Sequence, residues 1–318
     1  MRRRAAVTLT AVALALVACG ASGETHTAPK PAPVVGPYDA RLLASAPDGL
    51  VTAERLSYKA FDGETVPALF AIATAGRARA CLIWEDGLGS TKEDAEAIWQ
   101  GAARIGLSTF SIDLRDQGQR GTMAQLLRAI RSPTALAALV TGSVNDLMRA
   151  VTILEAQPAC HHVVGYSGLS LGGIIGTLLA AQDRDVRAAV LMSVPPTWDA
   201  AIHSTHDVDE LGSVLLPGLV GHPAALRAAL RVLSPLDPDR YVCRIAPRPV
   251  LLLAGRHDNV FPPSEARQFQ AAACRPKTIV NYDGGHIPLG PPGTSPAVAA
   301  ANAQVITEFL FHRLVPGG

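Results

Sequence analysis

The sequence is poor in the features that mark several large classes of protein. Aromatic residues make up only 5% of the 318 residues, the formal net charge is +1, and no run of lysine or arginine follows the N-terminal leader. Such a chain offers neither the basic surface of a nucleic-acid-binding protein nor a row of aromatic rings for stacking sugars or bases. We therefore expect no nucleic-acid partner.

Cysteine is also scarce and is not spaced for metal binding. Neither C-x-x-C nor H-x-x-x-H occurs, so we expect no metal site, and nothing in the sequence calls for another cofactor. Outside the leader, four cysteines allow three pairings. Cys243 and Cys274 each precede one of two strands expected to be neighbours, and we favour a disulfide between them. For Cys81 and Cys160, a second disulfide and two buried free thiols remain equal alternatives.

Long hydrophobic runs are absent after the leader. The apolar run at residues 5–18 follows three arginines and is too short to span a bilayer, which indicates a secretory signal peptide over residues 1–18. Its end, Leu16-Val17-Ala18-Cys19, resembles the lipobox of bacterial lipoproteins. That resemblance implies a lipid on Cys19 and an anchor on the extracytoplasmic side of the cell envelope. The alternative is an ordinary signal peptide cut near Ala18 or Ala21.

The rest of the chain divides into a tether and one domain. Residues 19–50 begin with Cys19 and a Pro/Ala-rich stretch without a periodic apolar face, which is typical of a tether. Residues 51–318 suit one large α/β domain better than two small ones. Strand and helix alternate after residue 80, which predicts a mostly parallel sheet covered on both faces. Strands are expected at 54–61, 65–74, 79–84, 107–112, 163–169, 188–193, 249–254 and 277–281, with a helix at 146–154.

The stretch HHVVGYSGLSLGGIIGTLLAAQD predicts a strand, a tight turn and a helix, and the period changes at Ser170. G-x-S-x-G in this context is typical of a nucleophile elbow, in which a strained turn exposes a serine hydroxyl above the sheet. Gly168 and Gly172 keep Cβ atoms out of a place where strand and helix nearly touch. Ser167 lacks the second glycine and is expected to be a strand residue.

Six features with the expected order and spacing carry a family resemblance: the Asp-Gly turn at Asp62 and the strings WEDGLGSTKEDA, DLRDQGQRG, GLSLGG, RPVLLLAGRHDNVFPP and NYDGGH. From Glu54 to Leu314 the chain resembles the α/β-hydrolases. Within them it is similar to the branch of dienelactone-hydrolase-like esterases, acetylxylan-esterase-type enzymes and prolyl-oligopeptidase catalytic domains. The resemblance implies a mostly parallel sheet with an antiparallel N-terminal hairpin, helices on both faces, and a small cap at residues 197–241.

The same resemblance assigns catalytic roles. It implies Ser170 as nucleophile, Asp258 as acid and His286 as base, in the chain order expected for this fold. The backbone N–H groups of Leu171 and Leu88 would form the oxyanion hole.

The loop that holds Leu88 departs from the family, because Asp86-Gly87 replaces the usual His-Gly. A carboxylate beside the oxyanion would oppose its charge. Glu85 and Asp86 must therefore point away or pair with a cation such as Arg115 or Lys92.

These inferences lead to one function and two alternatives. We expect a serine hydrolase that cleaves small-molecule carboxylic esters through an acyl-enzyme, held at the membrane by its lipid. One alternative is a peptidase or amidase of the prolyl-oligopeptidase type. The other is a catalytically silent lipoprotein that binds within the envelope.

Overall fold

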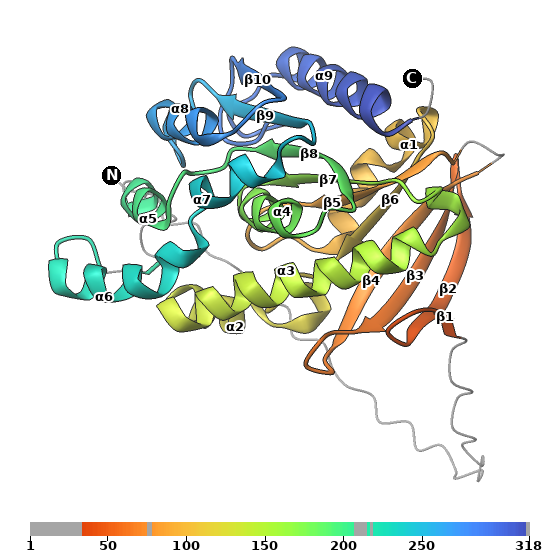
Figure 1. Cartoon of the computed structure of the whole chain (residues 1–318), viewed down its shortest axis with the longest axis horizontal. Coiled ribbons are helices and arrows are strands. Elements are labelled where there is room, and N and C mark those ends of the chain that lie inside the picture. The colour runs from red at the N-terminus through yellow and green to blue at the C-terminus, as the bar shows by residue number, and fades with distance from the viewer. Residues whose placement is uncertain (1–33, 75–77, 207–214, 217–218, 316–318) are drawn as a thin grey trace, which may run out of the picture. The chain divides into compact units, whose positions relative to one another are not determined.

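The computed structural model describes residues 34–74, 78–206, 215–216 and 219–315 (Figure 1). The predicted signal peptide and Cys19 lie outside these residues.

A single mixed sheet forms the centre of the described domain. Its strands lie in the order β1-β2-β3-β4-β6-β5-β7-β8-β9-β10. Neighbours from β1 to β4, and β4 with β6, are antiparallel, and all later neighbours are parallel. The expected parallel sheet with an antiparallel N-terminal part is confirmed. The strands are β1 Val34–Gly36, β2 Ala40–Asp48, β3 Val51–Lys59, β4 Thr65–Ala73, β5 Ala80–Glu85, β6 Leu107–Ile112, β7 Val164–Leu169, β8 Val186–Met192, β9 Val250–Gly255 and β10 Lys277–Tyr282.

The central strands are continuous runs of buried residues. Every residue of β5, β6, β7 and β9 is buried, as is required of strands that carry helices on both faces. β10, at the edge of the sheet, is largely exposed along its length.

Helices cover both faces of the sheet (Figure 1). Helices α1 and α9 pack on one face around a core that includes Trp99 and Leu310, and the core of the opposite face includes Leu139 and Ile175. The helices are α1 Glu96–Arg104, α2 Met123–Ile130, α3 Pro133–Glu155, α4 Leu171–Gln182, α5 Trp198–His206, α6 Pro223–Leu233, α7 Asp239–Val242, α8 Pro263–Ala272 and α9 Pro296–Leu314.

Helix α3 is much longer than the helix expected at residues 146–154. It begins at Pro133, after Ser132, whose side chain accepts a hydrogen bond from the N–H of Ala135. By length and composition α3 could cross a membrane, contrary to the expectation that no later segment is apolar enough. Its apolar face instead packs into the core of this domain, and even the polar side chains of Ser143 and Asp146 are buried.

The predicted tether at residues 19–50 extends too far into the domain. Residues 41–48 of β2 pair with β3, so this segment belongs to the sheet. Most of β2 is exposed. For this reason its sequence lacks the alternation of apolar and polar residues that predicts a half-buried strand. It resembles the Pro-rich stretch before it instead.

Two disulfides join cysteines that lie at or just before the starts of strands. Cys243 bonds to Cys274, with Cα atoms 4.5 Å apart, and Cys81 bonds to Cys160, with Cα atoms 4.8 Å apart. The first is the pair favoured from the sequence. The second disulfide shows that Cys81 and Cys160 are bonded to each other and are not two buried free thiols.

Candidate active site

The candidate catalytic residues follow three parallel strands at the same edge of the sheet. Ser170 comes directly after β7, Asp258 lies in the loop after β9, and His286 lies in the loop after β10. In register, the end of β7 pairs with the end of β8, and Gly255 pairs with Tyr282. The carboxyl ends of parallel strands meet at one edge, which is where open α/β sheets bind ligands.

Ser170 has a strained backbone. Its φ is 55° and its ψ is −115°, a conformation that non-glycine residues rarely adopt. Hydrogen bonds hold it on both sides, since its N–H donates to the Met192 carbonyl and its carbonyl accepts from the N–H of Ile174, each at 2.9 Å. Ser167 is a fully buried residue of β7, as expected.

Glycines permit the close approach of strand, helix and loop at this turn. A Cβ on Gly168 would lie 2.5 Å from the Gly172 carbonyl oxygen, and one on Gly172 would overlap the carbonyl of Glu85. A Cβ on Gly87 would lie 3.4 Å from the Ser170 Cβ. The loop after β5 therefore runs directly beside the serine.

The base and the acid form a hydrogen-bonded pair. The His286 Nδ1 lies 3.0 Å from each carboxylate oxygen of Asp258. Because both facing atoms are acceptors, Nδ1 carries the proton and Nε2 is left to accept one. Asp258 is itself held by the backbone N–H groups of Val260 and Phe261, which donate to its Oδ1 at 2.9 Å.

Phe261 contacts His286 and also lines the pocket that contains Ser170. Its ring meets the His286 ring edge to face, with centroids 5.2 Å apart, and it lines the same pocket as Ser170. The described contacts include no hydrogen bond between Ser170 and His286. Catalytic hydrogen bonds of this kind often shorten only when the substrate binds.

The sequence analysis missed the residues that support His286 from behind. Ser193 donates its hydroxyl to the His286 carbonyl at 2.7 Å, and Tyr282 donates to the Gly285 carbonyl at 2.6 Å. Ser193 follows the end of β8, at the same edge as the other site residues. Its position directly after a predicted strand is the signal that could have found it.

The candidate oxyanion donors lie on either side of the serine. Leu171 is the first residue of α4, and Leu88 lies in the loop after β5. That loop is fixed to the helix by the N–H of Gly172, which donates to the Asp86 carbonyl at 3.1 Å. Within the described part of the chain, no acceptor contacts the backbone N–H of Leu88 or Leu171, so both donors remain available.

The two acidic residues before Leu88 do not pair with the cations proposed for them. Glu85 is buried and accepts from the Ile112 N–H at 3.0 Å, and burial raises its pKa well above the ordinary value. Asp86 turns toward Trp84, whose indole N–H donates to its carboxylate at 3.1 Å, and burial raises its pKa as well. Asp86 therefore points away from the oxyanion hole, as one of the two alternatives proposed, while the burial of Glu85 favours its uncharged form.

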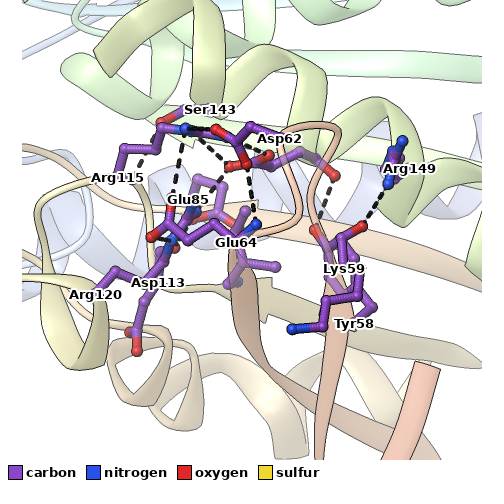
Figure 2. Close-up of polar contacts among 12 residues, drawn as sticks. Tyr58, Lys59, Asp62, Glu64, Glu85, Asp113, Arg115, Arg120, Ser143 and Arg149 are labelled. Carbon is purple, nitrogen blue, oxygen red and sulfur yellow. Dashed lines mark hydrogen bonds and ion pairs between the residues drawn. The ribbon is translucent and has the colours of Figure 1, made fainter. Parts of the chain in front are cut away.

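Arg115, which was proposed as a partner of Glu85 and Asp86, belongs instead to a separate cluster of charged residues. We call Asp62, Glu64, Arg115, Arg120 and Asp146 the Asp146 cluster. Arg115 and Arg120 reach the buried Asp146 carboxylate at 3.0 and 2.8 Å. Arg115 also pairs with Asp62 at 2.5 Å, and Arg120 pairs with Glu64 at 2.9 Å. Figure 2 shows both arginines beside the two acidic residues of the β3–β4 turn.

The Asp146 cluster fixes the loop after β6, and this loop in turn holds the Leu88 loop. Gln117 accepts from the Gly89 N–H at 2.5 Å. The buried Asp113 carboxylate accepts from both the N–H and the Nζ of Lys92, at 3.0 and 2.8 Å. Hydrogen bonds therefore tie the loop after β6 both to the cluster and to the loop that holds Leu88.

Ser170 opens into an apolar pocket with about 520 Å³ of empty space, including its open mouth. Side chains from α2, α3, α4 and the segment after β8 line it, among them Ile130, Leu136, Ile174 and Trp198. The predicted cap interval, residues 197–241, thus contributes a wall of this pocket through α5.

His257 adjoins Asp258 in the sequence, which makes it a rival candidate for the base, but its position in the loop predicts a surface side chain. Its Nε2 lies 2.8 Å from the Asp283 carboxylate, and the two side chains are 71% and 73% exposed. This position matches the surface role expected for it.

Comparison with known proteins identifies the fold. No protein-family model and no curated protein matches the chain. Acetyl xylan esterase 1 from Thermoanaerobacterium sp. JW/SL YS485 has a TM-score of 0.66 at 19% identity, covering 85% of this chain and 87% of its own. The acetyl xylan esterase from Paenibacillus sp. R4 has a TM-score of 0.68 at 16% identity, covering 86% and 89%. The acylaminoacyl peptidase of Pyrococcus horikoshii has a TM-score of 0.63 at 14% identity, over 84% of this chain but 42% of its own. The chain has the α/β-hydrolase fold.

Proposed function

We propose that the chain is a serine hydrolase that cleaves carboxylic esters through an acyl-enzyme intermediate. The observation that carries this proposal is the strained Ser170, held at the end of β7 beside an apolar pocket and at the same edge of the sheet as the His286–Asp258 pair. A backbone strained at one exposed hydroxyl is the arrangement that serine nucleophiles use on this fold.

The proposed chemistry assigns one role to each residue. Ser170 Oγ attacks the ester carbonyl while His286 Nε2 takes its proton, and His286 then protonates the leaving alkoxide. Asp258 keeps the proton on Nδ1 and stabilises the imidazolium that forms. Water, activated by the same histidine, releases the acid in the second half of the reaction.

The negative oxygen of the tetrahedral intermediate is proposed to lie between the N–H groups of Leu88 and Leu171. Leu171 stands at the N-terminus of α4, where the helix dipole also favours negative charge. Burial raises the pKa of Glu85 behind this loop, which reduces the negative charge that would oppose the oxyanion.

Labelling of the purified domain with a fluorophosphonate tests the proposal. We expect Ser170 to be labelled, Ser170→Ala to lose the label, and p-nitrophenyl ester turnover to fall at least about 10⁴-fold in that variant. His257→Ala, at the exposed surface, serves as the matched control and should keep both activities. A folded wild-type protein without label would overturn the proposal, and faster cleavage of aminoacyl anilides than of esters would favour a peptidase.

We also propose that the mature protein is exported and anchored through a lipid on Cys19. The two disulfides support export, because structural disulfides persist mainly in oxidising compartments. Labelling with an alkyne fatty acid should mark the wild type but not Cys19→Ser, and the variant should move from the membrane to the soluble fraction. Wild-type protein that is soluble and unlabelled would contradict this proposal.

A further inference from the structure

The pocket beside Ser170 is enclosed by hydrocarbon. Apart from Ser170, the described side chains that line it are all apolar, and they come from α2, α3, α4, α5, the cap interval and the loops after β5 and β9. Trp198 carries the one nitrogen among them, and this Nε1 atom is buried, so it offers no hydrogen bond to a molecule in the pocket. Beyond the nucleophile itself, the described walls therefore provide neither a charge nor a side-chain hydrogen bond.

A polar group on a bound chain would lose its hydrogen bonds to water here without replacement. Such a loss is unfavourable for a neutral oxygen and far more so for a charge. The backbone N–H groups of Leu88 and Leu171 have no acceptor in the described part of the chain, but the proposed mechanism assigns both to the oxyanion. The pocket therefore selects a chain of carbon and hydrogen.

The pocket is deeper than an acetyl group needs. Ile174 lines it, and its N–H bonds to the Ser170 carbonyl, so Ile174 lies one turn of α4, about 5.4 Å, beyond the nucleophile. Ile130 and Leu136, which belong to the core, line it as well. An extended chain advances about 1.2 Å per bond, so about four or five bonds are needed to reach that depth. A chain of that length removes much more apolar surface from water than acetyl does.

The acyl part of an ester is the part that this pocket can hold. In the proposed mechanism His286 must protonate the leaving oxygen, and His286 is not among the described residues that line the pocket. Ser170, Leu88 and Leu171 do line it, so the space opens at the attacking hydroxyl and the proposed oxyanion donors. The alcohol therefore leaves on the side of His286, and the acyl chain extends into the pocket.

We infer that the substrates are esters of uncharged alkyl carboxylic acids with about five or six carbons, rather than acetate esters. This inference rests on the proposed ester hydrolysis and names its substrate class. Leu136 of α3 is a wall residue that sets the length of the acyl chain.

p-Nitrophenyl esters from acetate to octanoate test the chain length with a single leaving group. After division by the rates with hydroxide alone, kcat/KM of the wild type should rise about fourfold per methylene as far as pentanoate or hexanoate and then fall. 3-Methoxypropanoate replaces one methylene of pentanoate with an ether oxygen and should react about tenfold more slowly than pentanoate. A flat profile, a maximum at acetate, or equal rates for this matched pair would overturn the inference.

Two matched variants of α3 test whether this pocket sets the length. Leu136 and Leu139 are 1% and 2% exposed, and only Leu136 is among the described lining residues. Leu136→Ala shortens a wall side chain and should move the maximum to a longer acyl chain. Leu139→Ala removes the same atoms from the core and should keep the wild-type maximum. The same shift in both variants, or no shift in Leu136→Ala, would contradict the role of this pocket.

Alkyl pentanoates from methyl to hexyl distinguish the acyl side from the alcohol side. For the wild type, kcat/KM should change less than about twofold per methylene of the alcohol, and a steeper rise along the alcohol than along the acyl chain would contradict the inference. Both ester series need only the wild-type protein and so cover a variant that fails to fold. Fluorophosphonate labelling separates the two proposals. Folded wild type without label defeats the hydrolase itself, whereas normal labelling with a flat acyl profile defeats only the substrate class.

Discussion

Burial controls the charge of the carboxyl groups beside the proposed oxyanion hole. Glu85 lies in the core at the end of β5, and its carboxyl oxygen faces the Ile112 N–H rather than a cation. Burial raises its pKa well above the ordinary value of 4.5. The folded protein therefore holds a proton on Glu85 at pH values where the unfolded chain has released it.

This raised pKa predicts how stability changes with pH. Above pH 4.5 the unfolded chain loses the Glu85 proton and the folded protein keeps it, so Glu85 lowers the free energy of unfolding as pH rises toward its folded pKa. Glu85→Gln removes this effect. In denaturant titrations from pH 4 to 8, the variant should gain on the wild type with rising pH, by at most about 1.4 kcal/mol per pH unit. A constant difference across that range would contradict the prediction.

Asp258 has a role that its amide cannot fill. In Asp258→Asn the amide can donate to Nδ1 and so favour the tautomer with its proton on Nε2, which cannot accept the serine proton. We expect kcat for p-nitrophenyl esters to fall by about 10⁴-fold at pH 7 with little change in fold. Asp283→Asn alters the exposed carboxylate beside His257 and should leave kcat unchanged. A similar loss in both variants would speak against the assignment.

At the residue scale, the sequence predicted the groups that follow strands and did not predict those placed by packing. Ser170, Asp258 and His286 each come after a predicted strand, and parallel strands bring such positions to one edge. Phe261 and Trp198 contribute through contacts with residues distant in the sequence. Nothing in their local sequence marks those contacts.

Between elements, the Asp146 cluster joins the β3–β4 turn, the loop after β6 and α3. Its central carboxylate is fully buried, and two arginines contact it. In a site of low polarity, removing one charge leaves the opposite charges without compensation. Removing the Asp146 carboxylate should therefore lower the free energy of unfolding far more than removing any exposed ion pair at the edge of the cluster.

Replacing Asp146, at the centre of the cluster, or Asp62, at its edge, with asparagine compares the stability that the two carboxylates contribute. Asp146→Asn should lower the free energy of unfolding by about 3–5 kcal/mol and reduce kcat, because the loop that holds Gln117 loses its support. Asp62→Asn changes a carboxylate that is 51% exposed, although its hydrogen bond to Arg115 lowers its pKa to about 2. That substitution should cost no more than about 1 kcal/mol. Thermal unfolding and ester turnover measure both, and equal costs would contradict the prediction.

Buried elements were predicted well because their sequences are continuously apolar. Strands β5 and β9, whose buried sequences are almost continuously apolar, lie within one residue of their predicted bounds. Exposed β2 and the first half of α3 were missed. Their side chains either face solvent or mix small and polar residues, so local patterns carried no clear period.

On the scale of the whole domain, the N-terminal boundary can be tested by truncation. A chain that starts at residue 34 keeps every strand, whereas one that starts at residue 51 loses β1 and β2 and exposes the edge of β3. We expect the first to unfold at the same temperature as a chain that starts at residue 19. The second should unfold at a clearly lower temperature and aggregate, because its new edge is long and unpaired. Equal melting temperatures of the two truncated chains would indicate that the predicted tether does extend to residue 50.

The disulfides have a consequence for how the chain matures. Cys81 pairs with Cys160 and Cys243 with Cys274, so each bond joins cysteines that are consecutive in the sequence after the leader. A chain that crosses a membrane from its N-terminus exposes them to an oxidant in that order. Oxidation in order of emergence then produces the native bonds directly, with no mispaired bond to rearrange. Secretion in cells that retain the oxidising enzyme but lack a disulfide isomerase should therefore give a normal yield of the native protein.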